Sequence, residues 1–565
     1  MRFRTLWGWI AGGALALLPL AGAPAQAAPE PIKAPLEAPI KAPIKAPIKA
    51  MSAAPGLSGG EGGNSGPVTV TLEPATKADP ILKTIVGQPK APPTGDDPAT
   101  RCVLLSYKDL TKIKDAPAQM LSASVTPGKD GEPSLCEISG FIAPQVGFTM
   151  WMPLENWNGK YLQTGCGGRC GKLLPDTCLI QYKRGYACMA HDLGHRSTTY
   201  DNVWAIDDVP AEIDFGFRAT HVAAIVGKVI TEAYYRKPPV HSYFIGASTG
   251  GRQALVAVQR FPKDFDGVIG GVAMAKVPGV DPNEPYSMGG KILWQDGKAV
   301  LTADEIRMVH AAVMARCDAA DGLKDGIITD SKGCTFQPAS LLCKGEKAAT
   351  CLTPKQVATL DTIYAGGTQR GSELGWIGAY VAQDNSKGRY IARTEDGYSY
   401  PYSWVFNDSS NPDIRPFQKA GGKFILYGGW ADEVVNPVGT SSYYDAVENL
   451  IGSRAETQKF FRTFMIPGES HIPGNVGAES INYLYALEKW VEKGEAPDVL
   501  VGHKLKTITI MLGPIVLDQD MVPENYLYSR PNYPYPIQSR YKGKGNPDDA
   551  SSFAPWDPKA RKWMR

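Results

Sequence analysis

The sequence predicts an α/β fold in which a mostly parallel sheet is covered by helices. Short apolar runs with strand character, 149–152, 160–163 and 268–271, alternate with helical patterns such as 217–235. The second observation is a strand-to-helix turn at Ser248, since an apolar run leads into it and a run of helix formers follows it. Alternation of strands and helices along one chain favours parallel strands with helices packed on the sheet.

The N-terminal segment has the composition of a secretory signal peptide. Arg2 and Arg4 precede the apolar stretch 6–20, and Ala25-Gln26-Ala27 offers a small-residue cleavage site. We therefore expect a signal peptide over 1–27 and a mature protein that is secreted or periplasmic. A retained membrane anchor is the alternative. No other segment is apolar enough to span a bilayer, so no membrane contact is expected after cleavage.

A proline-rich tether follows this leader. The repeat Pro-Ile-Lys-Ala recurs over 39–50, and a Gly/Ser-rich stretch extends to residue 66. Proline at every fourth residue excludes both helix and sheet, so 28–66 is predicted to be a solvated linker. The net charge of +2, without a long basic run beyond the leader, argues against a nucleic-acid partner.

The ordered region is expected to consist of three parts. With 565 residues, 43% of them hydrophobic, the chain can bury a large core. Regular strand and helix patterns cover 67–271 and resume over 422–565, whereas 272–421 is irregular and rich in Gly, Trp, Tyr and Cys. We interpret 272–421 as a lid domain inserted into the α/β domain that the other two parts form.

The ten cysteines form an even set, as expected for disulfides in an exported protein. They group locally along the chain as Cys102 with Cys136, Cys317 with Cys334, Cys343 with Cys351, and a central set of Cys166, Cys170, Cys178 and Cys188. The pairing within the central set stays open. A zinc site there is the alternative, although Cys166 and Cys170 lack a matching second ligand pair.

The pentapeptide Gly246-Ala247-Ser248-Thr249-Gly250 matches the G-x-S-x-G pattern of a nucleophile elbow. Its glycines allow the strained turn that lifts the hydroxyl out of the sheet, and Gly251 allows the following helix to pack closely. Because the pentapeptide alone is common by chance, the flanking strand and helix patterns are needed for the assignment. Ser248 is the candidate nucleophile of an acyl-transfer hydrolase.

A serine hydroxyl needs a base to remove its proton, and an imidazole base needs a carboxylate to hold its orientation. In α/β-hydrolases both partners follow the serine, on loops after sheet strands, in the order acid and then histidine. Asp432 follows the strand pattern 424–427, and His471 lies in a turn-rich loop after the strand pattern 461–466. We therefore predict an α/β-hydrolase fold with a large inserted lid and a triad of Ser248, Asp432 and His471.

Other residues compete for these roles. Glu433 and Glu469 are the nearest alternatives to Asp432 as the acid. Among the seven histidines, His191 and His195 form a polar cluster that could line the site, although a structural role is favoured for both. The helix and strand contexts of three others indicate structural roles for His221, His241 and His310.

An oxyanion hole requires two main-chain N–H groups directed at the developing negative charge. Thr249, directly after the serine, supplies one of them by its position. The second is expected from the glycine-rich loop 165–168 that follows a strand pattern. Gly167 or Gly168 is the candidate, because a residue without a side chain lets the substrate approach its amide.

Several longer motifs resemble the tannase and feruloyl esterase family, which also includes enzymes that hydrolyse the mono(hydroxyethyl) ester of terephthalate. The resemblance spans most of the mature chain and includes Trp157-Asn158-Gly159-Lys160-Tyr161-Leu162, the run from Ser248 to Leu255, and Gly429-Trp430-Ala431-Asp432. The lid run 317–327 and the tail from Arg530 to Gly543 are similar as well. This resemblance implies a secreted α/β-hydrolase that cleaves esters of aromatic carboxylic acids.

The chain departs from the family at the cysteines around the site. In the family one cysteine usually precedes the serine, another follows the histidine, and their disulfide ties the two loops together; here these places hold Ala247 and Ile472. Both are absent together, so no unpaired thiol remains and packing could replace the crosslink. The family's tail cysteines are likewise replaced, by Tyr533 and Pro555. His471 must rely more on its own loop, because a disulfide commonly contributes about 2–4 kcal/mol.

The resemblance also implies a calcium site in the lid. Asp318, Asp321 and Asp325, with the main-chain carbonyls of Leu323 and Ile327, match the family's ligands. Closely spaced hard oxygens around glycine turns suit Ca²⁺. A solvated Asp-Gly turn is the alternative. The ion would be structural and would hold the lid.

For substrate contact, the lid offers aromatic side chains against which an aromatic acid could stack, with Trp404 as the candidate. Arg393 could pair with a free carboxylate. The expected reaction is a two-step ester hydrolysis with an acyl-enzyme on Ser248, and the expected partner is a small aromatic ester. Two alternatives stay open: a non-catalytic, calcium-stabilised binding protein on a hydrolase scaffold, and an amidase that uses the same triad.

Overall fold

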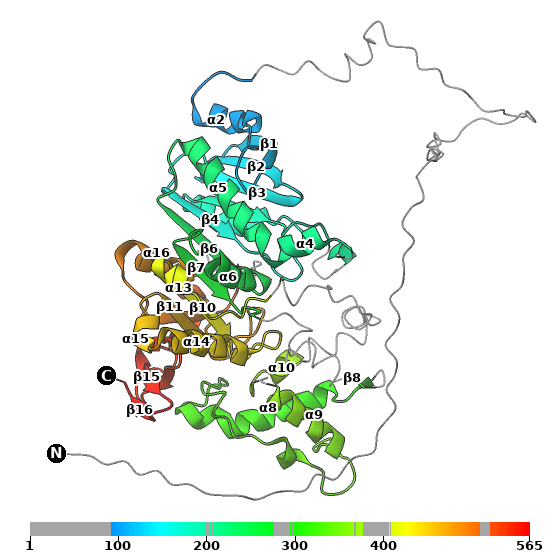
Figure 1. The fold of residues 1–565 in the computed structure, drawn as a ribbon. Helices are drawn as coiled ribbons and strands as arrows, with labels where there is room; N and C mark the ends of the chain where they lie inside the picture. The colour runs from blue at the N-terminus through cyan, green and yellow to red at the C-terminus, as the bar shows by residue number, and fades with distance from the viewer. Residues whose placement is uncertain are drawn as a thin grey trace, which may run out of the picture. The chain divides into compact units, whose positions relative to one another are not determined.

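The computed structural model describes residues 92–564 apart from 130, 198–202, 206, 276–293, 296–297, 367–368, 377–405, 407 and 509–519. The predicted signal peptide (1–27) and linker (28–66) lie outside the described residues. A sheet of nine described strands forms the centre, in the order β1-β2-β3-β5-β4-β6-β7-β10-β11 (Figure 1). Its strands are β1 (Ala118–Thr126), β2 (Leu135–Ile142), β3 (Val146–Pro153), β4 (Lys160–Thr164), β5 (Ala187–His191), β6 (His241–Ala247), β7 (Gly267–Gly271), β10 (Lys423–Gly429) and β11 (Phe461–Ile466).

The sheet has a parallel part and an antiparallel part. The six strands from β5 to β11 in this order pair in parallel, as the sequence predicts. By contrast, β1, β2, β3 and β5 pair antiparallel. Only residues 143–145 separate β2 from β3, and a connection this short can join only antiparallel neighbours.

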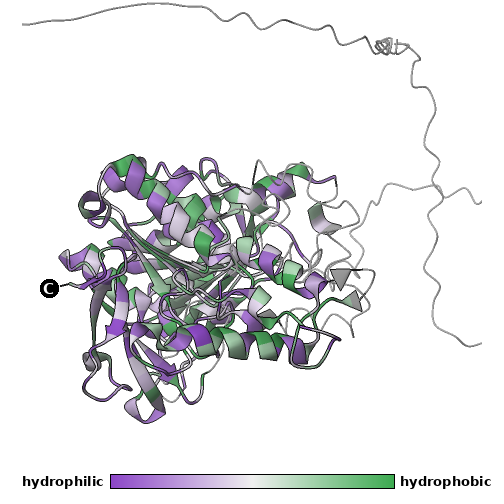
Figure 2. Cartoon of the chain, turned by 90° about the horizontal axis from the view of Figure 1, so that it is seen from below, coloured by the Kyte–Doolittle hydropathy of each residue, from purple (hydrophilic) through white to green (hydrophobic). Residues whose placement is uncertain are grey.

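Apolar side chains alternate between the two faces of this sheet. Phe244 of β6 belongs to one core cluster, which also contains residues of α5 (Ala219–Tyr235), α6 (Thr249–Arg260) and α14 (Pro437–Ile451). Its neighbour Ile245 belongs to a second cluster, with residues of α16 (Tyr483–Lys493). Successive strand residues point to opposite faces, so each face needs its own helix layer. In Figure 2 the central strands are mostly hydrophobic, and hydrophilic residues gather on the outer helices and loops.

Shorter elements complete the described part. They are α2 (Pro98–Leu104), α3 (Leu179–Lys183), α4 (Val209–Ile213), α10 (Glu373–Trp376), α13 (Arg415–Lys419), α15 (Arg454–Thr457), β8 (Trp294–Gln295) and β9 (Lys298–Ala299). No helix in the described ranges combines the length and the apolar character needed to cross a membrane.

The predicted lid region, 272–421, has a hydrophobic cluster of its own among its described residues. Its two main helices, α8 (Ala303–Cys317) and α9 (Pro354–Ala365), each begin with a capping box, at Thr302 and at Thr353. The helices lie together beside the sheet domain (Figure 1). Their buried residues form a cluster separate from both sheet clusters, including Ile306, Val309, Val313, Leu352 and Leu360. The bounds of the three predicted parts stay a prediction.

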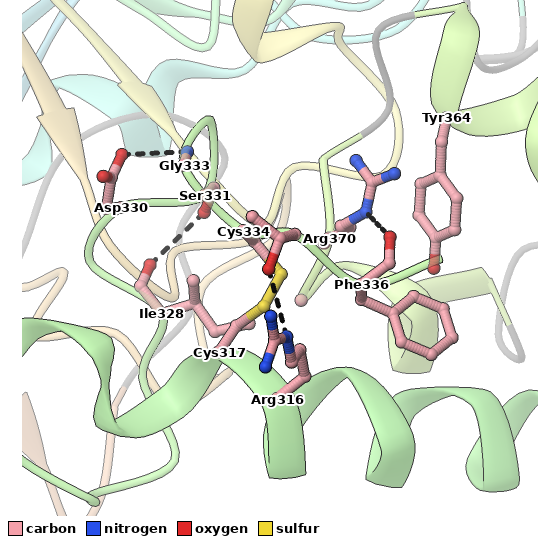
Figure 3. The surroundings of a disulfide bond; sticks show 12 residues. Arg316, Cys317, Ile328, Asp330, Ser331, Gly333, Cys334, Phe336, Tyr364 and Arg370 are labelled. Carbon is pink, nitrogen blue, oxygen red and sulfur yellow. Dashed lines mark hydrogen bonds between the residues drawn. A yellow bond between two sulfur atoms is a disulfide. The ribbon is translucent and has the colours of Figure 1, made fainter. Parts of the chain in front are cut away.

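A disulfide closes the turn at the end of α8. Cys317 is joined to Cys334 (Figure 3). Around this bond the loop is held by main-chain contacts: Arg370 Nε donates to the Phe336 carbonyl at 2.9 Å, and Ser331 Oγ donates to the Ile328 carbonyl at 3.3 Å. The crosslink therefore fixes the loop that runs from α8 toward the C-terminal segment.

The C-terminal segment contacts both the lid and the sheet domain. Its strands are β12 (Leu500–Leu505), β13 (Tyr526–Asn532), β14 (Gln538–Tyr541), β15 (Phe553–Asp557) and β16 (Lys562–Trp563). Arg530 of β13 forms an ion pair with Asp325 of the lid at 2.8 Å, and Gln538 Nε2 donates to Asp330 at 3.0 Å. The N–H of Tyr535 donates to the carbonyl of Thr463 in β11 at 2.7 Å.

Five disulfides use all ten cysteines, and no free thiol remains. The three pairs expected from the local grouping of the cysteines are present. In the central set, Cys166 pairs with Cys170 and Cys178 pairs with Cys188. The zinc alternative for this set is therefore wrong, because a metal-binding thiolate cannot be part of a disulfide.

Candidate active site

Ser248 occupies a strained turn between β6 and α6. Its backbone has φ 59° and ψ −120°, a conformation unfavourable for a residue with a side chain. Its N–H donates to the carbonyl of Gly271 in the neighbouring strand at 2.9 Å. A Cβ on Gly246 would lie 2.6 Å from the Gly250 carbonyl oxygen, so only glycine fits on that side of the turn. The predicted elbow geometry is therefore present.

The imidazole of His471 lies between the hydroxyl of Ser248 and the carboxylate of Asp432. Nε2 lies 3.0 Å from Ser248 Oγ, and Nδ1 lies 3.0 Å from Asp432 Oδ2. A carboxylate only accepts hydrogen bonds, so Nδ1 carries the proton and Nε2 is the acceptor for the serine hydroxyl. The structure thus brings together three predicted site residues that lie far apart in the sequence.

Asp432 is fixed by its own loop after β10. It is buried, and its second oxygen, Oδ1, accepts the N–H groups of Val434 at 2.8 Å and Val435 at 2.7 Å. These two amides hold the carboxylate in one orientation and leave Oδ2 for the imidazole. The N–H of Ala431 donates to the carbonyl of Glu469, which lies in the loop that holds His471. This contact joins the loop of the acid to the loop of the histidine.

The electrostatic setting favours the protonated imidazole. Burial lowers the pKa of His471, but the negative charge and hydrogen bond of Asp432, with a contribution from Glu433, outweigh it and raise that pKa overall. Burial, followed by repulsion from Asp432, raises the pKa of Glu433. An imidazole made more basic by its neighbours can accept a proton from a hydroxyl and hold it as the cation.

The two glutamates considered as alternative acids have other positions. Glu433 Oε2 accepts the main-chain N–H of His471 at 3.3 Å, so it contacts the loop and not the ring. Glu469 is buried, its Oε2 has no hydrogen-bond partner among the described residues, and burial raises its pKa well above the ordinary value. Asp432 is the carboxylate that contacts the imidazole.

The glycine loop after β4 lies against the first turn of α6. Thr249 is the first residue of α6, where N–H groups have no partner within the helix. Its hydroxyl donates to the carbonyl of Gly168 at 2.5 Å. A side chain at Gly167 would meet no described atom within 4 Å, so the space over this residue is open. Of the two predicted glycines, Gly168 therefore contacts the residue directly after Ser248.

A family model described as tannase and feruloyl esterase matches residues 133–398 and 391–555. The chain belongs to the tannase and feruloyl esterase family. An uncharacterized esterase of Xanthomonas campestris pv. campestris is 30% identical over 529 residues, which cover 79% of this chain and 88% of that protein. A probable feruloyl esterase of Arthroderma benhamiae is 31% identical over 468 residues, which cover 73% and 83% of the two chains.

The fold agrees with solved members of the tannase and feruloyl esterase family. The crystal structure of feruloyl esterase B from Aspergillus oryzae aligns with a TM-score of 0.68 at 27% identity, covering 81% of this chain and 100% of that one. This likeness confirms the predicted α/β-hydrolase fold. Membership of the family makes the chain a carboxylic ester hydrolase.

The structure also describes the surroundings of four other histidines of this esterase. His191 is buried, its ring nitrogens have no hydrogen-bond partner among the described residues, and burial lowers its pKa to about 4. His195 is stacked on Trp204, with 3.7 Å between ring centroids. The remaining two contact carboxylates, with His221 Nδ1 2.7 Å from Asp264 and His310 Nδ1 2.9 Å from Glu373.

The predicted calcium ligands lie on one loop after α8. Asp318 accepts the N–H groups of Asp325 at 3.2 Å and Gly326 at 3.1 Å, and Asp321 accepts the N–H of Leu323 at 3.1 Å. Burial, with repulsion from Asp325 and Asp318, raises the pKa of Asp321 to about 6. In the described part, no three Asp, Glu, His or Cys side chains are arranged to hold a metal ion. A cation would therefore also need main-chain carbonyls, such as the predicted ones of Leu323 and Ile327.

The substrate-contact candidates Trp404 and Arg393 lie outside the described residues.

Some features of the site were not predicted. The contact between Glu433 and the main chain of His471 has no sequence signal beyond two adjacent acidic residues. The disulfide between Cys166 and Cys170 does have a sequence signal, since the two cysteines flank the Gly-Gly pair, but the four cysteines of the central set allow three pairings.

Proposed function

We propose that this protein is an exported serine esterase that hydrolyses esters of phenolic or related aromatic carboxylic acids. The main support is the continuous chain of contacts from Ser248 through His471 to Asp432, built on a strained elbow. The names of relatives support the substrate class, since several are feruloyl esterases. The five disulfides support export, because such bonds persist in oxidising compartments.

In the proposed mechanism, Nε2 of His471 takes the proton of Ser248 as the hydroxyl attacks the ester carbonyl carbon. Asp432 holds the imidazole and stabilises the cation that forms. The C–O bond to the alcohol then breaks, the alcohol leaves with the proton from His471, and an acyl-enzyme remains. Water repeats the sequence and releases the aromatic acid and the free serine.

The negative charge on the carbonyl oxygen needs donors that are in place before the reaction. The N–H of Thr249 is one, because the first N–H groups of α6 have no partner within the helix. The second is proposed to come from Gly167, over which the space is open, or from Gly168, whose carbonyl accepts the hydroxyl of Thr249. Loss of one such donor commonly costs about 10²–10³ in kcat.

We also propose that the loop 318–327 holds a structural Ca²⁺. Three carboxylates on one short loop would repel one another; burial first, and this repulsion in addition, raise the pKa of Asp321. A cation would remove that repulsion, with oxygens of the carboxylates and of the loop main chain as ligands. The ion takes no part in the proposed chemistry.

The test of the serine is Ser248→Ala, with the exposed Ser442→Ala as the matched control. Initial rates would be measured on methyl ferulate, methyl gallate and a terephthalate monoester, together with the corresponding amides. Ser248→Ala should lose all measurable turnover and all labelling by a fluorophosphonate probe, while its circular dichroism and Tm stay as in the control. Unchanged hydrolysis by Ser248→Ala would refute the proposal. Faster cleavage of amides than of esters would favour an amidase, and an unlabelled wild type without turnover would favour a binding protein.

A further inference from the structure

The glycine loop beside Ser248 contains a disulfide across its own tip. Cys166 and Cys170 are bonded at a sequence separation of four, so Gly167 and Gly168 lie inside a small covalent ring. The turn is also closed by the N–H of Cys170, which donates to the Gly167 carbonyl at 3.0 Å. Gly168 and Cys170 have φ of 60° and 58°, in the left-handed region. Glycine is free to adopt many conformations, so a Gly-Gly pair without such a ring would be poorly defined.

The ring is packed main chain against main chain on the first turn of α6. A Cβ on Gly165 would lie 2.8 Å from Gly250 Cα, and a Cβ on Gly250 would lie 3.3 Å from the Cys166 carbonyl oxygen. The hydroxyl of Thr249 donates to the Gly168 carbonyl, and Gln253 Nε2 lies 3.3 Å from Cys166 Sγ. The loop is thus tied to the same helix that begins at the candidate nucleophile.

His195 also contacts the loop that the disulfide closes. Its Nε2 lies 2.8 Å from the Arg169 carbonyl oxygen, which can only accept, so Nε2 carries the proton. Burial lowers the pKa of His195 to about 4, which keeps its imidazole neutral at neutral pH. Stacking on Trp204 fixes its plane. This buried histidine, ambiguous in the sequence, contacts the loop that borders the elbow.

We propose that the Cys166–Cys170 disulfide, together with the Thr249 hydroxyl and His195, positions the amides of Gly167 and Gly168 as the second half of the oxyanion hole. The inference rests on the proposed function. These groups act as positioning residues, because none of them is assigned a contact with the reacting atoms through its side chain. A donor that is fixed beforehand needs no reorganisation when the charge develops, and small misplacements are costly in rate.

The experiment compares two disulfide deletions in the same segment. Cys166→Ala with Cys170→Ala removes the ring, and Cys178→Ala with Cys188→Ala is the matched control. Each protein is assayed for kcat, for Tm, and for affinity toward phenylboronic acid and benzoate. Phenylboronic acid probes the oxyanion hole, because the Ser248 oxygen bonds to boron, His471 takes the serine proton, and the boron becomes a tetrahedral anion. Benzoate forms no such adduct.

Loss of the ring should lower kcat and phenylboronic acid affinity by roughly 10- to 100-fold and leave benzoate affinity unchanged. The control pair should keep wild-type kcat and both affinities, whatever its Tm. Equal phenylboronic acid affinity in the ring variant and the control would overturn the inference. A purely structural role would lower both affinities together, or would lower Tm without a selective loss of phenylboronic acid affinity, and either result would also overturn it.

Thr249→Val provides a second variant that leaves every cysteine in place. It removes the hydroxyl that contacts the Gly168 carbonyl but keeps the side-chain shape, so it decides the question if the ring variant does not fold. We expect a fall of about 3- to 10-fold in phenylboronic acid affinity, corresponding to one lost hydrogen bond, and no fall would count against the inference. If wild type and Ser248→Ala hydrolyse esters equally, the proposed function fails. If Ser248→Ala is inactive but the ring variant and Thr249→Val keep the wild-type affinity for phenylboronic acid, the inference alone fails.

Discussion

At the residue scale, two consecutive acids hold one histidine in different ways. Asp432 contacts the imidazole, whereas Glu433 accepts the main-chain N–H of the same residue, His471. Packing was the expected replacement for the family's missing crosslink next to this histidine. Ile472, which occupies the place of one of its cysteines, is 59% exposed and therefore buries little surface. Hydrogen bonds to the loop, including that of Glu433, are the contacts that hold His471.

Glu433 should affect both the position and the pKa of His471, and two variants separate these effects. Glu433→Gln keeps an oxygen that can accept the N–H but removes a charge that raises the imidazole pKa. We expect kcat close to wild type. The acid limb of the kcat/KM profile should shift to lower pH, because a less basic imidazole stays neutral at lower pH. Glu433→Ala should show the same shift and also a fall of about 3- to 10-fold in kcat, since one hydrogen bond contributes roughly 0.5–1.5 kcal/mol.

The pH–rate profiles of both variants, measured against the exposed Asp304→Asn as control, check this expectation. A profile with the wild-type acid limb in Glu433→Gln would show that this charge does not reach the imidazole. Equal kcat in the alanine and glutamine variants would show that the main-chain contact does not position His471.

At the element scale, the approach of α6 to β7 depends on a glycine. A Cβ on Gly251 would lie 2.4 Å from the Gly271 carbonyl oxygen and 2.8 Å from Ala273 Cα. Both contacts are with main-chain atoms, which cannot turn aside as a flexible side chain can. The helix that begins at the candidate nucleophile is thereby held directly against the sheet.

Gly251→Ala should therefore destabilise the fold, in contrast with alanine at a helical glycine that has free space. Gly439 in α14 is the matched control, because a Cβ there meets no described atom within 4 Å. We expect Gly251→Ala to lower the free energy of unfolding by about 1–3 kcal/mol through overpacking. Gly439→Ala should raise it by up to about 1 kcal/mol through helix propensity. Urea titrations followed by circular dichroism would measure both, and the same sign for both variants would contradict the expectation.

Whether an element could be predicted from the sequence depended on whether its pattern is local. The strand, turn and helix around Ser248 follow from local patterns, since alternation of apolar residues and a glycine-flanked serine are visible within 20 or so residues. The antiparallel pairing of β1 with β2 depends on contacts between separate segments, and half-exposed β1 has little apolar signal. The ring at Cys166 and Cys170 could not be assigned, because four cysteines allow three pairings.

At the scale of the whole molecule, chain order constrains which residues can come into contact with Ser248. In an α/β-hydrolase the strands that precede the acid and the histidine end at the same edge of the sheet. Strand patterns before Asp432 and His471 were therefore enough to bring both to Ser248. Glu433 and His195 could not be predicted in this way, because their contacts are with main-chain atoms, which leave no trace in residue type.

The lid is joined to the remainder of the molecule through its acidic loop. Arg530 of the C-terminal segment pairs with Asp325, one of the predicted calcium ligands. Lys332, a few residues further along, donates to Ser441 of α14 at 3.0 Å and to Tyr535 at 3.2 Å. A change in the charge of this loop should therefore affect the stability of more than the lid.

Calcium should decide how the stability of the molecule depends on pH. Burial and the neighbouring carboxylates raise the pKa of Asp321 from 3.8 to about 6 in the folded chain. The folded state then binds this proton more tightly than the unfolded state does, so without a cation stability falls as the pH rises from about 3.8 to about 6.

A bound Ca²⁺ favours the ionised carboxylates and should remove this fall. In metal-free buffers, after passage over a chelating resin at neutral pH, we expect Tm to decline between pH 4 and pH 7 by about 1–2 °C, as for a loss of about 1–2 kcal/mol in a chain of this size, and excess Ca²⁺ should restore it. Asp321→Asn should show little response to either treatment, whereas Asp304→Asn should respond as wild type. If Tm in metal-free buffer and in Ca²⁺ coincides at pH 7 for the wild type, the loop is a solvated Asp-Gly turn whose carboxylates are held by their own main-chain N–H groups.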